Sequence, residues 1–141
     1  MLLRGVLLVS LGLCGPAFGQ PHTTTEGPTT YDAIFKPLLH SEARYAVLGP
    51  VGPFYPEVAI TYTHAGASVR TGEAILECQI KGSGQLDRCK VLSSNPMPVF
   101  GVAAQRMATM RRIIVSGGPP DGQRVRVRVP FDPATKAQVV P

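Results

Sequence analysis

Hydrophobic and polar positions alternate most clearly along Glu73–Leu92, which is predicted to form a β-hairpin. The residues expected on its inner face before the turn are Ala74, Leu76, Cys78 and Ile80. Polar side chains occupy most of the positions between them, and this period of two is typical of a strand with one buried face. Gly82-Ser83-Gly84 then supplies the positive φ angles of a tight turn. The remainder of the chain is expected to cover this hairpin or to extend its sheet.

The returning strand of the hairpin needs one extra residue to keep its hydrophobic positions in phase. Cys89 and Val91 share a face, whereas Leu86 is out of phase with both. A β-bulge at Asp87–Arg88 would return Leu86 to the inner face. With this bulge, Cys78 and Cys89 come close to opposite each other across the hairpin.

A second clear alternation, in Gln123–Phe131, predicts a half-buried strand. The residues expected to be buried are Val125, Val127, Val129 and Phe131. The opposite face carries Arg124, Arg126 and Arg128, here called the arginine row. Pro130 has no N–H to donate, which favours an edge strand over a central one. The arginine row fits either a solvated edge protected against aggregation or an edge that accepts an extended, acidic peptide by strand addition.

Between the hairpin and the last strand, a helix is predicted over Val99–Arg111. The residues at the spacing of a buried helical stripe are Ala103, Met107, Met110 and Ile114. A stripe rich in methionine can also line an adaptable binding groove, but core packing is the favoured interpretation. A shorter helix is predicted after Pro56, over Glu57–Ile60, followed by a loop with a short strand over Thr61–Gly72.

The chain has 141 residues, enough for one small domain and its flanking segments. A net charge of +5 favours acidic partners. No aromatic residues are interleaved with the arginine row, so nucleic acid is not an expected partner. The expected organisation is a signal peptide (residues 1–19), a polar leader and wrapping segment (20–48), the main domain (49–132) and a flexible tail (133–141).

The first residues have the form of a secretory signal peptide. Arg4 precedes the short apolar run Val6–Leu13, and Ala17-Phe18-Gly19 offers small residues before a cleavage point at Gln20. The run is shorter than the roughly 18 apolar residues that a membrane span needs. A periplasmic location after cleavage is therefore expected. The alternatives are an uncleaved anchor in the inner membrane and a lipoprotein attached through Cys14.

Cleavage would leave two cysteines, Cys78 and Cys89, in an oxidising compartment. An even pair in an exported chain predicts a disulfide. The alternative is a pair of small apolar thiols on the core face of the hairpin.

No residues with catalytic or metal-binding spacing emerge from the sequence. The three histidines lie far apart, and the two cysteines of the hairpin do not form a C-x-x-C motif. The acidic residues are scattered, and no glycine-rich phosphate loop follows a predicted strand. The sequence therefore predicts a non-enzymatic protein with no cofactor and no metal, and a small secreted enzyme is the alternative.

Four segments, in this order and spacing, resemble the C-terminal domain of the TonB family. They are YPEVA (55–59), ILECQIKGSGQLDRCKVLSS (75–94), the paired alanines of GVAAQRMATMRRI (101–113) and DGQRVRVRVPF (121–131). The resemblance covers about residues 54–132 and extends to members with a cysteine pair flanking the hairpin turn. It implies a two-layer α+β domain, in which a helix packs on a three-stranded antiparallel sheet. The implied order is β-β-α-β after a short N-terminal helix.

The resemblance also implies a mode of binding. In the TonB family this domain pairs with a short segment of an outer-membrane receptor, the TonB box, which adds to the last strand. Carried over by position, the partner-binding residues would be Tyr55, Pro56, Arg124, Val125, Arg126, Val127, Arg128 and Val129.

The long proline-rich spacer of a TonB energy transducer is missing from this sequence. The expected function is therefore that of a free-standing periplasmic domain that binds an extended peptide from an outer-membrane receptor. The alternatives are a membrane-anchored transducer and, through an exposed strand edge, a homodimer.

Overall fold

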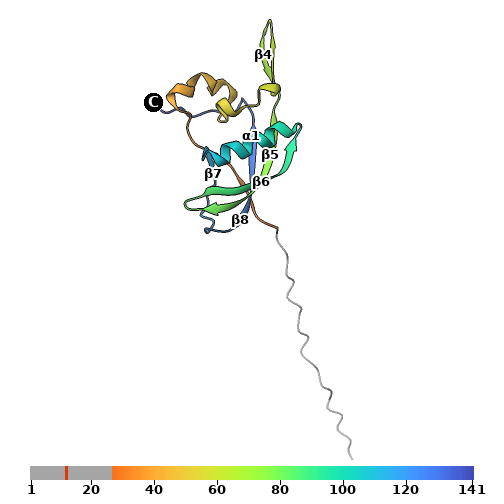
Figure 1. Ribbon diagram of the computed structural model, residues 1–141, viewed down its shortest axis with the longest axis vertical. Coiled ribbons are helices and arrows are strands. Elements are labelled where there is room, and N and C mark those ends of the chain that lie inside the picture. Colours follow the sequence, from red (N-terminus) through yellow and green to blue (C-terminus); the bar gives the residue numbers. More distant parts are fainter. Residues whose placement is uncertain (1–11, 13–26) are drawn as a thin grey trace, which may run out of the picture.

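The computed structural model describes Gly12 and residues 27–141, which form a mostly β domain with one α-helix (Figure 1). The predicted signal peptide lies outside the described residues apart from Gly12, as do residues 20–26 of the leader. The strands are β1 Thr30–Asp32, β2 Ile34–Phe35, β3 Ile60–Thr63, β4 Gly66–Val69, β5 Gly72–Lys81, β6 Gln85–Asn95, β7 Ile113–Ile114 and β8 Arg124–Phe131. The helices are α1 Pro98–Thr109 and the 3₁₀ helices η1 His40–Leu48, η2 Gly52–Phe54 and η3 Glu57–Ala59.

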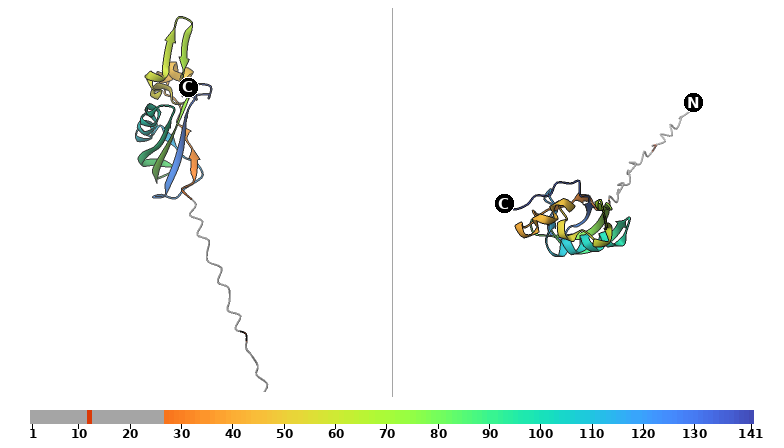
Figure 2. Two further views of the ribbon diagram at one scale, coloured as in Figure 1. Left: turned by 90° about the vertical axis from the view of Figure 1, so that its right-hand side faces the viewer. Right: turned by 90° about the horizontal axis from the view of Figure 1, so that it is seen from above.

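Six of the strands form one curled sheet in the order β1-β8-β5-β6-β7-β2, and β3 and β4 form a separate hairpin. The edge strands β1 and β2 are consecutive in the chain with only Ala33 between them, so the sheet curls until its two edges nearly meet (Figure 2). The predicted two-layer α+β fold with a three-stranded antiparallel sheet is therefore wrong. The sheet is larger because β1, β2 and β7 join it, and strands of two or three residues are too short to show a period in the sequence.

The central hairpin, β5–β6, confirms the prediction made from its alternating pattern. The four inner residues of β5 are at most 2% exposed. All three residues of the Gly82-Ser83-Gly84 turn have positive φ angles. Glu77 pairs with Lys90 and Gln79 pairs with Asp87, so two residues of β6 lie opposite one residue of β5 at the predicted bulge.

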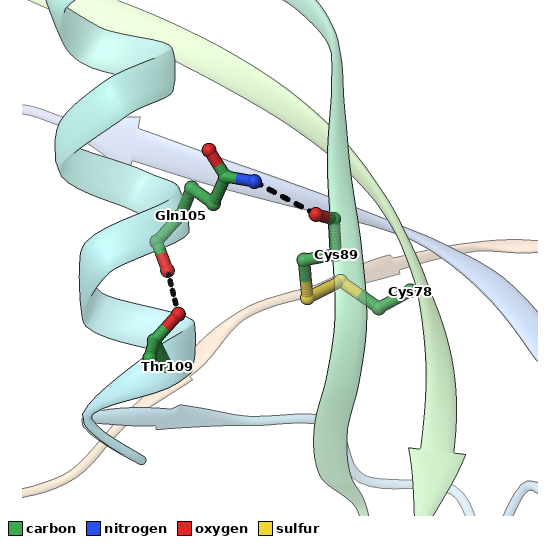
Figure 3. The surroundings of a disulfide bond; sticks show 4 residues. All are labelled: Cys78, Cys89, Gln105 and Thr109. Carbon is green, nitrogen blue, oxygen red and sulfur yellow. Dashed lines mark hydrogen bonds between the residues drawn. A yellow bond between two sulfur atoms is a disulfide. The ribbon is translucent and has the colours of Figure 1, made fainter.

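A disulfide joins Cys78 and Cys89 at this bulge (Figure 3). The carbonyl oxygen of Cys89 also accepts a hydrogen bond of 2.8 Å from Nε2 of Gln105 on α1. The predicted disulfide is thus present in the structure, and the bulged part of β6 is attached to both β5 and the helix.

The inner face of the sheet packs against α1, and the predicted stripe is right in part, since Met107 is buried and Ala103 packs against the core. The buried side of α1 consists of Phe100, Gly101, Ala104, Met107 and Ala108. Met110 is 52% exposed, and Ile114 lies in β7 instead of the helix. The helix lies close to β6, since a Cβ atom at Gly101 would come within 2.6 Å of Val91 Cγ1.

The hairpin β3–β4 projects from the body of the domain as an arm (Figure 1). Residues 61–68 are all exposed, and Tyr62 is 74% exposed. The sequence predicts a loop with a short strand over Thr61–Gly72, because Gly66 and Gly72 are typical of loops. The structure shows a two-stranded hairpin there instead.

Residues 31–48 wrap around the domain, and after β1 and β2 they make further contacts through Leu38 and Glu42. Leu38 is buried, and its backbone exchanges hydrogen bonds with the C-terminal segment, from Leu38 N–H to Gln138 O at 2.8 Å and from Val140 N–H to Leu38 O at 2.9 Å. Glu42 in η1 accepts hydrogen bonds of 3.1 and 2.6 Å from the guanidinium of Arg112. The predicted flexible tail therefore meets the wrapping segment.

Candidate peptide-binding strand

Strand β8 carries most of the predicted partner-binding residues, and its two faces differ as the sequence predicts. Val125, Val127 and Val129 are fully buried in the core, as is Phe131. The arginine row lies on the outer face of the sheet, where the side chains of Arg124 and Arg128 are 65% and 49% exposed. A partner on this face would meet the arginines and the backbone of β8, whereas the valines are unavailable to it.

The backbone of β8 is not at the edge of the sheet, so the edge-strand prediction is wrong. Strand β1 lies outside it and pairs with it in parallel, with Thr30, Tyr31 and Asp32 opposite Arg126, Val127 and Arg128. Figure 2 shows this short strand beside the C-terminal strand. On its other side β8 pairs with β5 in antiparallel fashion over eight residue pairs.

The direction of each backbone group explains why Pro130 is tolerated in β8. Arg126 N–H donates to Thr29 O at 3.2 Å, and Arg128 O accepts from Ala33 N–H at 3.1 Å. The even-numbered residues of β8 therefore turn their N–H groups toward β1. Pro130 shares this side by alternation, and β1 has already ended there, so its missing N–H leaves no ladder bond unmade.

The arginine row is partly neutralised by carboxylates on both neighbouring strands. Arg128 donates two hydrogen bonds, from Nε at 3.0 Å and from Nη2 at 2.6 Å, to the same carboxylate oxygen of Asp32 on β1. These bonds and the charge of Asp32 raise the pKa of the Arg128 guanidinium above its ordinary value. On β5, Glu77 lies 3.5 Å from Arg124 and 4.0 Å from Arg126. Within the arginine row, Arg126 has a buried Nε–H that donates no hydrogen bond to any described residue.

Tyr55 lies in the core and Pro56 lines a hollow beside α1, so neither is on the outer face that carries the arginine row. The ring of Tyr55 is 5% exposed and makes edge-on contacts with Phe100 and Phe131, at centroid distances of 6.3 and 5.9 Å. Its hydroxyl donates to Arg70 O at 2.6 Å. Burial, with a smaller contribution from the charge of Asp132, raises the pKa of Tyr55. These contacts give Tyr55 a role in the core.

The residues of β1 are the part of this site that the sequence did not predict. Thr30 and Asp32 are exposed, and Tyr31 is half-buried against the core. They follow a threonine-rich leader in which a three-residue strand shows no period. The one available signal was Asp32, an acidic residue that could complement the arginine row.

The described residues offer little to support a metal centre or a membrane span. No group of three or more His, Cys, Asp or Glu side chains among them is placed to hold a metal ion. No helix of residues 27–141 is long and apolar enough to cross a membrane. No family model, curated protein or solved structure matches this chain.

Proposed function

We propose that this chain is a non-enzymatic, periplasmic binding domain that takes up an extended peptide by strand addition on β8. The observation that carries the proposal is β1, a three-residue strand of the chain's own N-terminal segment that already pairs with that side of β8. It supports the proposal because β1 pairs with the β8 backbone, bonds to Arg128 through Asp32 and packs Tyr31 against the core, which are the contacts that an added strand would need. An incoming peptide would take the place of β1.

The attachment of β1 to β8 is weak enough for exchange. It covers three residue pairs, against eight between β8 and β5. Its ion pair, Asp32–Arg128, is exposed, and an exposed pair of this kind contributes about 0.2–1 kcal/mol. Tyr31 supplies the only side chain of β1 that packs on the core. A longer peptide with the same features would form more ladder bonds than β1 does.

The charges around β8 indicate the kind of peptide that fits. Asp32 occupies the position opposite Arg128, so a carboxylate at the equivalent position of a peptide would accept the same pair of charge-assisted hydrogen bonds from Arg128. An aromatic or large aliphatic residue just before it would replace Tyr31. The motif is therefore an extended segment with one apolar residue followed by an acidic one.

The resemblance to the TonB C-terminal domain suggests where such a peptide comes from. In that family the partner is a segment of an outer-membrane receptor, and the same class of partner is proposed here. The Cys78–Cys89 disulfide supports an exported location, because disulfides persist mainly in oxidising compartments.

The proposal is tested by retention of outer-membrane proteins on the purified mature chain. Arg126→Pro removes an N–H that faces β1, and Arg126→Ala removes the side chain but keeps that N–H, so the pair separates strand addition from charge. Val127 is unsuitable for this purpose because it is buried and its N–H faces β5. We expect solubilised outer membranes to yield a receptor that a TonB-box peptide competes away.

Arg126→Ala should keep most of this retention, and Arg126→Pro should lose it while remaining folded. Retention that survives Arg126→Pro, or is insensitive to the competing peptide, would contradict strand addition on β8.

A further inference from the structure

Five cationic side chains surround the disulfide-linked bulge of β6, away from the β1 side of β8. Arg88 is the inserted residue of the bulge, and it has a left-handed backbone conformation with φ of 50°. A hollow of about 230 Å³ on one side of it is lined by Lys90 and Arg124 as well as Arg88. A hollow of about 160 Å³ on the other side is lined by Lys81, Arg111 and again Arg88.

The positive charge in these hollows is mostly uncompensated. Each hollow is lined by three cations and one carboxylate, Glu77 in the larger and Asp87 in the smaller. Glu77 is already engaged by two arginines of β8. Among the described residues, no carboxylate forms an ion pair with any of the four other cations, Lys81, Arg88, Lys90 and Arg111.

The position of Arg88 is fixed by its neighbours. Cys89 follows it directly, and the disulfide to Cys78 attaches this part of β6 to β5. The Cys89 carbonyl oxygen is held by Gln105 of α1 (Figure 3). A cation on a backbone held from two sides binds an anion with a smaller loss of conformational entropy than one on a free loop.

We propose that this bulge is a binding site for a phosphate group, with Arg88 as the shared central cation. A guanidinium presents paired N–H donors that match phosphate oxygens, and the flanking lysines add charge without a directional requirement. The hollows are smaller than the roughly 300 Å³ of a typical small-molecule pocket, so they suit a phosphate group more than a whole organic ligand. No aromatic side chain lines either hollow, which excludes stacking on a nucleobase.

Free phosphate and the phosphate of a lipid headgroup share this chemistry, and two probes distinguish these sources. Inorganic phosphate is titrated into the mature protein by calorimetry at physiological ionic strength. Flotation is measured separately with vesicles of phosphatidic acid and with vesicles of neutral phosphatidylcholine. We expect Arg88→Gln to weaken binding of the effective probe at least about tenfold, because it removes a charge-assisted contact.

Arg44→Gln is the matched control, since Arg44 is an exposed arginine of η1 outside both hollows. If the protein binds free phosphate, and Arg88→Gln weakens this binding while Arg44→Gln does not, the result supports the site and identifies a soluble ligand. If the protein binds only phosphatidic acid vesicles, and this binding depends on Arg88 in the same way, the result supports the site and identifies a lipid headgroup as its ligand. Absence of binding to both probes, or equal losses with Arg44→Gln and Arg88→Gln, would overturn the proposal.

Discussion

Tyr55 lies in the core, although the resemblance to the TonB family implies that it is a partner-binding residue. The sequence shows a Tyr-Pro pair between glycines and prolines, and nothing in that pattern reveals which side of the segment is buried. In the structure, Tyr55, Phe100 and Phe131 contact one another in an aromatic cluster, although they are separated by up to 76 positions in the chain. Contacts over such separations are set by tertiary packing, which local patterns do not encode.

Replacing Tyr55 with Phe should destabilise the domain by about 1 kcal/mol, because the hydrogen bond to the Arg70 carbonyl oxygen is lost while the ring remains. Chemical denaturation at neutral pH measures the change. Tyr62→Phe is the control. Because Tyr62 is 74% exposed, this variant should be as stable as the wild type. Equal effects of the two substitutions would contradict the buried position of Tyr55.

Glu42 makes the attachment of η1 dependent on pH. The hydrogen bond from Arg112 lowers the pKa of the Glu42 carboxyl below its ordinary value of 4.5, although burial acts in the opposite direction. Because the folded-state pKa is lowered, the stabilisation is present above pH 4.5 and is lost as the pH falls through the folded-state value.

Glu42→Gln should therefore lower the free energy of unfolding by about 1 kcal/mol at pH 7 and by little in acid, where Glu42 is protonated. Thermal unfolding at a series of pH values measures the difference. Glu57→Gln, a change at an exposed residue outside any ion pair of the described chain, should have no such effect. A difference between wild type and Glu42→Gln that persists in strong acid would contradict this account.

At the scale of elements, the long strands were predictable and the short ones were not. Strands β5, β6 and β8 have eight or more residues each, so their alternation is visible, and even the bulge followed from the phase of Leu86. Strands β1, β2 and β7 have two or three residues and exist because longer strands supply their partners. The helix was predicted near its true position, but only part of its predicted buried stripe is right, since Met107 is buried whereas Met110 is exposed and Ile114 lies in β7.

Phe100→Ala should therefore lower the free energy of unfolding by about 3–5 kcal/mol, because the buried ring packs against both Tyr55 and Phe131. Met110→Ala should cost less than about 0.5 kcal/mol, since that side chain is 52% exposed. Denaturant unfolding of the two variants compares them directly. A larger loss of unfolding free energy for Met110→Ala than for Phe100→Ala would contradict the exposed position of Met110.

At the scale of the whole molecule, the chain's own N-terminal segment covers the strand that was expected to be an open edge. Short hydrogen-bonded strands of this kind are one way in which proteins protect sheet edges. The sequence could not show this, because edge status depends on the order of strands in space and not on the pattern within a strand. In this account β1 both protects β8 and marks the position of an incoming peptide.

The measurement that tests this account most directly is binding of a labelled peptide with the sequence of residues 27–35, GPTTYDAIF, to the mature protein by fluorescence anisotropy. If the peptide replaces β1, Asp32→Asn in the protein weakens the competing strand and should tighten binding about two- to fivefold. Arg126→Pro should abolish binding while Arg126→Ala retains most of it. Binding that is unchanged by Asp32→Asn and survives Arg126→Pro would contradict strand exchange on β8.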